Sequence, residues 1–201
     1  PFTLLGREAF ISASVGAAIY PDDGLEPGEL VRLADRAMYC SKNAGRNEFH
    51  FYDEAMTERV ADRLGLQTEL RVALERQEFF LVYQPKVDLA EGRICGFEAL
   101  LRWQHPQRGV VSPVEFIPVL EDTGMILGVG EWVLRQVARQ VGAWQAQGLA
   151  VPRVAINLSA RQFSSSELAG QLRAVLDDTG IDPSLLELEL TESMLMQDPD
   201  A

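Results

Sequence analysis

Four oxygen-bearing side chains recur along this 201-residue chain where apolar, strand-like segments begin or end. Glu98 opens the run Glu98–Trp103, Asn157 closes a later segment, and the Glu189-x-x-Glu192 pair closes a third. Hard cations such as Mg²⁺ and Mn²⁺ prefer carboxylate and amide oxygens as ligands. Two such ions can activate a water for attack on a phosphodiester. The pattern therefore predicts a divalent-metal site with ligands from successive strands.

Alternating strand-like and helical segments are expected to position these side chains. The expected strands cover residues 79–89, 93–103, 153–158 and 185–191, and the expected helices cover residues 113–122, 127–147 and 167–179. Strands that alternate with helices predict a parallel sheet covered by helices. In the longest of these helices, Trp132 and Trp144 fall on a broad apolar stripe. We therefore interpret both as packing residues rather than as a platform for a ligand.

The first part of the chain has a different pattern. The expected elements are a strand over residues 8–20, a helix over residues 29–43 and an extended segment over residues 48–52. A further helical pattern over residues 53–76 contains Gly65, and a glycine inside a helix costs about 1 kcal/mol relative to alanine. A break or kink is therefore expected there. The expected domains are residues 1–52 and residues 67–201, joined by a helical linker over residues 53–66.

The charge of the chain limits its partners. It carries 18 basic and 30 acidic residues, a net charge of −12, which argues against binding to a nucleic-acid polymer. Residues 179–201 hold six of the acidic residues and no Lys or Arg. Two interpretations of this acidic run stay open. It is either a solvated strand end and loop or a carboxylate cluster that a cation neutralises.

Cysteine usage and hydropathy indicate the compartment. Cys40 and Cys95 are the only cysteines, which excludes a disulfide framework and a zinc spacing and favours a reducing, cytoplasmic setting. No run approaches the roughly 20 apolar residues of a membrane span, so no direct membrane contact is expected from this segment. The chain begins at Pro1 and stops at Ala201. We therefore expect a piece of a longer protein, which other segments could tether to a membrane.

Six sequence blocks in the second part carry a family resemblance. They are Tyr83–Val87, Gly96–Trp103, His105–Pro106, Ser112–Pro118, Asn157–Phe163 and Leu188–Ser193. In this order they resemble the N-terminal half of an EAL domain, the metal-dependent phosphodiesterase module that hydrolyses cyclic di-GMP. The resemblance runs from about Leu66 to the end of the chain.

The first part resembles a second family. Residues 5–52 contain the blocks Ser12–Pro21, Ala34–Tyr39 and Lys42–Asn47, which resemble the C-terminal part of a GGDEF domain, the cyclic di-GMP synthase module. The loop that names this family would lie before Pro1. Lys42 and Arg46 match positions that meet triphosphate oxygens in the family. The alternative is that both are ordinary surface charges at a helix end.

The resemblance implies a fold and a site. The fold would be a partial TIM-type (β/α) barrel, an α/β architecture with its chemistry at the carboxyl ends of the strands. The C-terminal part of an α+β, nucleotidyl-cyclase-like GGDEF domain would precede it. By matched position, Glu98, Asn157 and Glu189 would hold Mg²⁺ or Mn²⁺. Glu98 and Glu189 would thereby be catalytic, and Glu192 would join them by steadying a loop at the metal site.

Two further residues match substrate-binding positions of the family. Arg102 would contact a ligand phosphate, because its planar fork donates two parallel hydrogen bonds. Gln84 would line the ligand pocket. For three other residues a purely structural role is the simpler interpretation. Asn157 could hydrogen-bond to the turn that follows it, His105 could be a loop residue, and Cys95 could be a buried strand residue.

The implied activity is hydrolysis of cyclic di-GMP to linear diguanylate (pGpG) by the full-length protein. Further ligands of a two-metal site would follow Ala201, and this segment alone is expected to be inactive because about half of the barrel strands lie outside it. Two alternatives stay open. One is a catalytically silent receptor for cyclic di-GMP, and the other is an EAL half that regulates an active GGDEF diguanylate cyclase. Paired EAL barrels are common in the family, so a homodimer through this domain is a further expectation.

Overall fold

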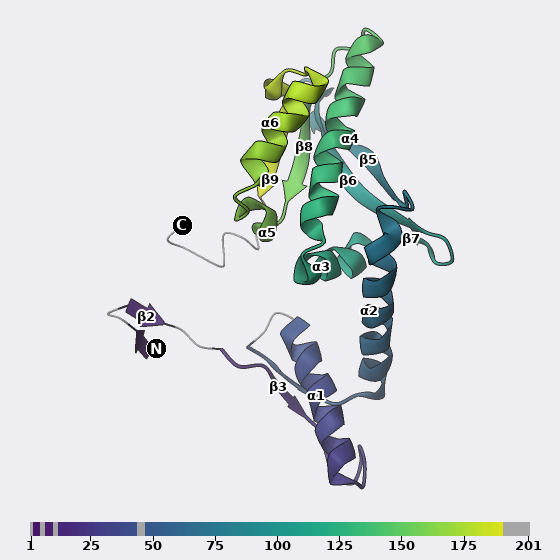
Figure 1. Cartoon of the computed structure of the whole chain (residues 1–201), viewed down its shortest axis with the longest axis vertical. Coiled ribbons are helices and arrows are strands. Elements are labelled where there is room, and N and C mark those ends of the chain that lie inside the picture. Colours follow the sequence, from purple (N-terminus) through teal and green to yellow (C-terminus); the bar gives the residue numbers. More distant parts are fainter. Residues whose placement is uncertain (1, 5–6, 10–11, 44–46, 191–201) are drawn as a thin grey trace. The chain divides into compact units, whose positions relative to one another are not determined.

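The computed structural model describes residues 2–4, 7–9, 12–43 and 47–190 of the chain (Figure 1). Contacts between Cα atoms divide the chain into two units, Pro1–Gly65 and Leu66–Ala201. No helix in the described ranges has both the length and the apolar character needed to cross a membrane.

The first unit consists of short strands, one complete long helix and the first part of α2 (Glu54–Ala73). β1 (Phe2–Leu4) pairs antiparallel with β2 (Arg7–Ala9), and β3 (Val15–Ala17) pairs parallel with β4 (Phe49–Phe51), with α1 (Pro27–Asn43) between them in the chain. A Cβ atom added at Gly16 would lie 2.0 Å from the carbonyl oxygen of Ala34, so only glycine lets β3 approach α1 so closely. The single strand expected over residues 8–20 is therefore wrong in extent, since β4 offers β3 only three paired residues.

α2 (Glu54–Ala73) is one helix without the break expected at Gly65. A Cβ atom at Gly65 would meet no atom within 4 Å, so no close contact requires glycine there. Leu66, Leu70 and Ala73 are buried in the core of the second unit. Burying a leucine side chain stabilises by about 1.5–3 kcal/mol. This burial exceeds the roughly 1 kcal/mol helix penalty of one glycine, and the helix continues.

The second unit is built on a five-stranded sheet. Its strands are β5 (Phe79–Asp88), β6 (Arg93–His105), β7 (Gly109–Val111), β8 (Arg153–Leu158) and β9 (Leu186–Leu190). The order is β5-β6-β8-β9, with β7 also paired to β6. β6, β8 and β9 run parallel, whereas β5 and β7 are antiparallel to β6. The all-parallel expectation is therefore wrong for β5, because residues 89–92 are too short a link for the crossover that parallel neighbours require.

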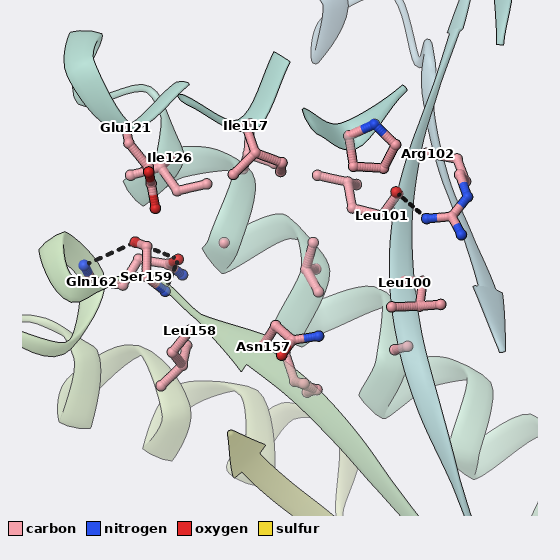
Figure 2. A pocket seen from close by; sticks show the side chains of 16 residues that line it. Leu100, Leu101, Arg102, Ile117, Glu121, Ile126, Asn157, Leu158, Ser159 and Gln162 are labelled. Atoms are coloured by element: carbon pink, nitrogen blue, oxygen red, sulfur yellow. Dashed lines mark hydrogen bonds between the residues drawn. The ribbon is translucent and has the colours of Figure 1, made fainter. Parts of the chain in front are cut away.

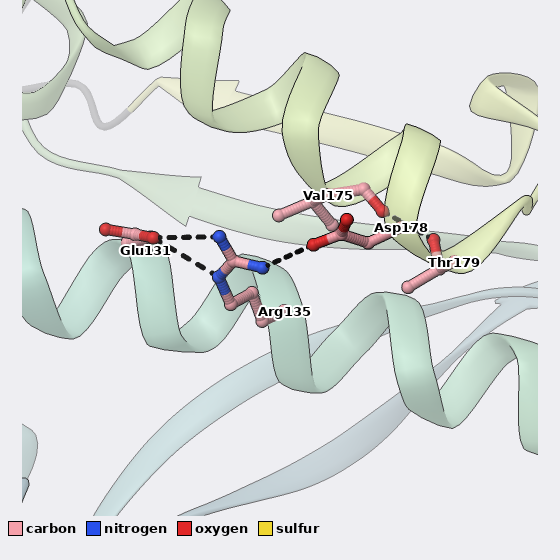
Figure 3. Close-up of polar contacts among 5 residues, drawn as sticks. All are labelled: Glu131, Arg135, Val175, Asp178 and Thr179. Carbon is pink, nitrogen blue, oxygen red and sulfur yellow. Dashed lines mark hydrogen bonds and ion pairs between the residues drawn. The ribbon is translucent and has the colours of Figure 1, made fainter.

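The helices of this unit cover one face of the sheet. They are α3 (Pro113–Thr123), α4 (Ile126–Ala146), the short α5 (Ala160–Phe163) and α6 (Leu168–Thr179), followed by the 3₁₀ turn η1 (Pro183–Leu185). α4 lies against β8 and beside α6 (Figure 1). Arg135 of α4 joins these two helices, since it donates hydrogen bonds to Glu131 of its own helix and, at 2.9 Å, to Asp178 of α6 (Figure 3).

The hydrophobic core lies between this face and the helices. Trp103 of β6 is fully buried, packs against the rings of Phe79 and Phe116, and donates a hydrogen bond to Glu78 at 3.0 Å. The ring of Trp132 lies 6.3 Å from that of Phe79, and that of Trp144 lies 5.0 Å from that of Tyr83. Both tryptophans are packing residues, as their position on an apolar stripe predicts.

Replacing Leu134 by alanine tests this core. Its side chain is 1% exposed at the centre of α4, and deleting a buried leucine side chain costs about 2–5 kcal/mol through lost burial and a residual cavity. We expect urea denaturation, monitored by tryptophan fluorescence, to show a decrease of this size in the free energy of unfolding. Leu149→Ala is the matched control, since Leu149 is 54% exposed and should change stability by less than about 0.5 kcal/mol. Equal losses in both variants would contradict the core assignment.

Candidate metal centre and adjoining pocket

The candidate ligands share the sheet face that the described helices leave uncovered. Successive strand residues point to opposite faces, so Val154, Ile156 and Leu158 of β8 enter the core while Asn157 lies on the other side. Strand register carries this alternation across the sheet, because Gln84 pairs with Glu98 and Asn157 pairs with Glu189. We call the surface that carries Gln84, Glu98, Asn157 and Glu189 the polar face.

Glu98 and Asn157 are in direct contact on this face. Asn157 Nδ2 donates a hydrogen bond to Glu98 Oε1 at 2.6 Å. Glu98 pairs in register with Ala155, so Asn157 lies one polar-face position further along the parallel strand β8 and its amide reaches back. The structure thus brings together two residues that are 59 positions apart in the sequence.

Glu189 is held by a residue that sequence analysis did not single out as a site residue. Lys86 Nζ donates a hydrogen bond to Glu189 Oε1 and forms an ion pair with it. This hydrogen bond raises the pKa of the Lys86 ammonium; burial opposes the rise, and the charges of Glu189, Glu187 and Glu98 add to it. Lys86 is two residues from Gln84 on β5, so the period of a strand could have placed it on the same face.

The three candidate ligands fit part of a hard-cation site. Within the described residues, Glu98 Oε2, Asn157 Oδ1 and Glu189 Oε2 make no hydrogen bond, so each side chain keeps an oxygen for a metal. No group of three His, Cys, Asp or Glu side chains that could hold a metal ion occurs within those same ranges. A complete site therefore needs further oxygen ligands. Glu192 lies outside the described residues.

A pocket of about 240 Å³ opens beside the polar face (Figure 2). It lies where the pairing of β6 with β8 ends, at Ala99 and Ile156. Its walls are mostly apolar and include Leu101, Leu158, Ile117, Ile126 and Val133. Asn157 of the candidate metal centre also lines it, as do Arg102, Glu121, Ser159 and Gln162. The pocket and the candidate metal ligands are therefore neighbours.

Of the two residues matched to substrate-binding positions, Arg102 lines the pocket and Gln84 does not. Arg102 lines the pocket, and its Nη1 donates a hydrogen bond to the carbonyl oxygen of its neighbour Leu101 at 2.8 Å (Figure 2). The Leu101 carbonyl is a neutral acceptor, and a phosphate would be a stronger one because it carries negative charge and can accept two parallel hydrogen bonds from a guanidinium. Gln84 is exposed on the polar face and does not line the pocket.

The turn after Asn157 is held by a capping box at the start of α5. Gln162 N donates to Ser159 Oγ at 3.3 Å, and Ser159 N donates to Gln162 Oε1 at 3.1 Å. Gly130 of α4 makes room, because a Cβ atom there would lie 1.9 Å from Gln162 Nε2. Ser159 and Gln162 are buried polar residues whose hydrogen bonds fix the end of β8. Asn157 itself bonds Glu98 rather than this turn.

The structure also places His105 and Cys95, to which the sequence analysis gave no role in the site. His105 is buried at the end of β6, where Nδ1 accepts hydrogen bonds from the amides of Gln107 and Arg108 and Nε2 lies 3.4 Å from Glu69 Oε2. It is thus the strand residue that holds the following turn, not a loop residue. The expectation of a buried Cys95 is wrong: it is exposed, and it is the unpaired residue at a register shift, where Gly96 lies opposite Lys86 and Ile94 lies opposite Val87.

Of the two basic residues matched to triphosphate positions, Lys42 lies exposed in the last turn of α1, and Arg46 falls outside the described residues. Their role in phosphate binding stays a prediction.

Comparison with known proteins identifies both parts. Residues 67–201 match the model of the EAL domain, and residues 1–48 match that of the diguanylate cyclase, GGDEF domain. The chain is 45% identical over its whole length to the bifunctional diguanylate cyclase/cyclic di-GMP phosphodiesterase MucR of Pseudomonas aeruginosa, and spans 29% of it. It is 38% identical over its whole length to the cyclic di-GMP phosphodiesterase PdeR of Escherichia coli, and spans 30% of it. The resemblance to the two families is confirmed, although the chain spans less than a third of either relative.

Solved structures agree with this match. The complex of the P. aeruginosa MucR phosphodiesterase with c-di-GMP superposes with a TM-score of 0.64 at 46% identity, over 68% of this chain and 55% of that one. The EAL enzyme Bd1971 in its form bound to cAMP and cyclic di-GMP gives a TM-score of 0.61 at 30% identity, over 71% and 40% of the two chains. The α/β fold expected for the second part, a partial TIM-type barrel, is confirmed.

Replacing Glu121 by glutamine tests the electrostatics of the pocket. Burial, and then the charge of Asp122, raise the pKa of the Glu121 carboxyl, so the folded state holds this proton more tightly than the unfolded state. Below the pKa that the Glu121 carboxyl has in the unfolded state, its burial costs no folding stability. Stability is lost as the pH rises through the higher pKa that this carboxyl has in the folded state. We expect Glu121→Gln to be more stable than the wild type at pH 7, with the gain disappearing near pH 4.

Urea denaturation between pH 4 and pH 8 measures this effect. The control is Glu115→Gln, which changes an exposed carboxylate on the same helix and should give no pH-dependent gain. A Glu121→Gln variant that is less stable at pH 7 would mean that the carboxylate makes a favourable contact.

Proposed function

The chain belongs to the EAL domain family through residues 67–201, and from this premise we propose that the full-length protein is a metal-dependent phosphodiesterase that hydrolyses cyclic di-GMP to pGpG. One observation carries the proposal: Glu98, Asn157 and Glu189 lie on one face of adjacent parallel strands, each with an oxygen free of hydrogen bonds in the described region. MucR and PdeR, which carry this activity in their names, support it.

The division of labour along the chain is part of the proposal. Residues 1–52 would be the C-terminal part of a GGDEF domain, residues 53–66 a helical linker, and residues 67–201 the N-terminal half of the EAL domain. The acidic, cysteine-poor chain suits a cytoplasmic protein, and a homodimer through the EAL domain is its proposed assembly.

Glu98, Asn157 and Glu189 would hold Mg²⁺ or Mn²⁺ together with further ligands of the full-length protein. When bound, two such ions supply an activated water and neutralise charge that develops on the phosphate. Glu98 and Glu189 would thereby be the catalytic carboxylates among the described residues. Glu192 would serve the same centre by steadying a loop beside it.

Arg102 and the pocket would orient the substrate. The net charge of −12 repels an anionic ligand, so local cations must bind its phosphates. Arg102 would exchange the Leu101 carbonyl for a phosphate and donate two parallel hydrogen bonds. The apolar pocket beside it has walls suited to a purine ring and a polar rim for its edge. Gln84 would contact the ligand from the polar face.

A catalytically silent receptor for cyclic di-GMP is the second candidate. One observation favours it: the ammonium of Lys86 is bonded to Glu189, and a lysine can supply part of the positive charge that a metal would supply. In that case the EAL half would bind the ligand without hydrolysing it and would pass the signal to another domain or to a partner.

Glu98→Gln in the full-length protein separates these two candidates. The substitution keeps the shape of the side chain but removes a negatively charged ligand. We expect the rate of pGpG release, measured by chromatography with Mg²⁺ or Mn²⁺, to fall more than about 100-fold, because altering even the outer partners of metal ligands costs 10–100-fold. Thermal unfolding of the metal-free variant should stay close to that of the wild type.

Glu187→Gln is the matched control. Glu187 is an exposed carboxylate that pairs with Ala155, one polar-face position before Glu189 on β9, and its loss should leave the rate within a few-fold of the wild type. Undiminished metal-dependent turnover in Glu98→Gln would refute the ligand assignment. A wild-type protein that binds cyclic di-GMP but releases no product would favour the receptor.

Arg102→Lys tests the phosphate contact. It keeps the charge and removes the planar fork, so one of two charge-assisted hydrogen bonds is lost, which is worth about 1.5–3 kcal/mol. We expect the Kd for cyclic di-GMP, measured by calorimetry with Ca²⁺ in place of Mg²⁺, to rise about tenfold or more. An unchanged Kd would place Arg102 away from the phosphate.

A further inference from the structure

Lys86 reaches Glu189 across most of the described sheet. It lies on β5 and Glu189 lies on β9, at opposite ends of the strand order β5-β6-β8-β9. Gly96 is the register partner of Lys86 on β6. A Cβ atom there would lie 3.8 Å from Lys86 Cβ and 3.7 Å from Lys86 Cδ. The aliphatic part of the lysine therefore lies over a position of β6 that has no side chain.

The ammonium of Lys86 ends among negative charges. Glu189 binds it directly, and the charges of Glu187 and Glu98 act on it as well. The side chains of Lys86 and Glu189 are 37% and 32% exposed, so water screens this pair only in part. Arg153 lines the same groove as Lys86 and Glu187 but makes no ion pair with Glu189 in the described part of the chain. Two cations thus share one groove, and one of them binds a candidate metal ligand.

The contact opposes metal binding in two ways. The ammonium occupies an oxygen of a carboxylate that would serve the metal, and it places a positive charge beside a divalent cation. A unit positive charge that close to a divalent ion weakens its binding even where water screens the two charges, and we expect an effect of about tenfold in affinity. Without a metal, the same charge offsets the mutual repulsion of the three carboxylates.

We propose that Lys86 sets the metal affinity of this centre: its ammonium holds Glu189 in the metal-free protein and competes with the divalent ion for that carboxylate. The inference rests on the proposed function, because it takes Glu189 as a metal ligand. Lys86 acts through Glu189 and is therefore a positioning residue rather than a catalytic one. The metal centre thus binds its ion by exchange against a cation that belongs to the chain.

The test measures Mn²⁺ binding to the full-length protein by electron paramagnetic resonance, without substrate, and thermal unfolding without metal. Lys86→Met keeps the aliphatic chain and removes the charge. We expect it to bind Mn²⁺ about tenfold more tightly, to unfold at a lower temperature without metal, and to gain more thermal stability from saturating Mn²⁺ than the wild type gains. Lys86→Arg, which keeps the charge, should bind Mn²⁺ within about threefold of the wild type.

Arg153→Met is the matched control, since it removes a charge from the same groove without touching Glu189. It should change Mn²⁺ affinity less than about threefold. Equal or weaker Mn²⁺ binding by Lys86→Met overturns the proposal, and so does an equal gain in Arg153→Met, which would assign the effect to net charge. A wild-type protein that binds no Mn²⁺ would instead overturn the metal centre of the proposed function, and the role of Lys86 with it.

Discussion

The parallel pairing of β6, β8 and β9 is the constraint on which the candidate site depends. Because side chains alternate along each strand, one register decides which residues enter the core and which reach the polar face. Val154, Ile156 and Leu158 fill the core, and this burial holds Asn157 on the opposite face beside Glu98. A slip of one residue would bury Asn157 and turn Ile156 toward water, so the hydrophobic core and the polar face stabilise the same register.

The polar face concentrates charge, and the chain balances it locally. Lys86 lies against Glu189, and the Asn157 amide donates to Glu98, so both candidate carboxylate ligands have a hydrogen-bond donor. A buried or half-buried carboxylate without such a partner is costly. The same partners leave one oxygen of each carboxylate free of hydrogen bonds in the described region. In the proposed function, the contacts that stabilise the metal-free protein therefore also leave oxygens available to a cation.

Much of the local structure could be predicted from the sequence, and the failures have physical causes. The periodicities at residues 127–147 and 153–158 predict α4 and β8 closely, because each element buries one apolar face. The break at Gly65 is wrong because burial of Leu66 and Leu70 outweighs a local propensity. The parallel orientation of β5 is wrong because residues 89–92 allow only a hairpin. Cys95 is exposed at a register shift between β5 and β6, where it has no partner residue.

The sequence by itself determined the two families, the order of the elements and the types of the candidate ligands, because these depend on short blocks and local periodicity. The tertiary structure alone decided which ligands touch. Glu98 binds Asn157 because parallel register brings β8 beside β6, and Lys86 reaches Glu189 because both side chains lie on the polar face of one sheet. These contacts join residues 59 and 103 positions apart, and only the pairing of the strands determines which residues meet over such separations.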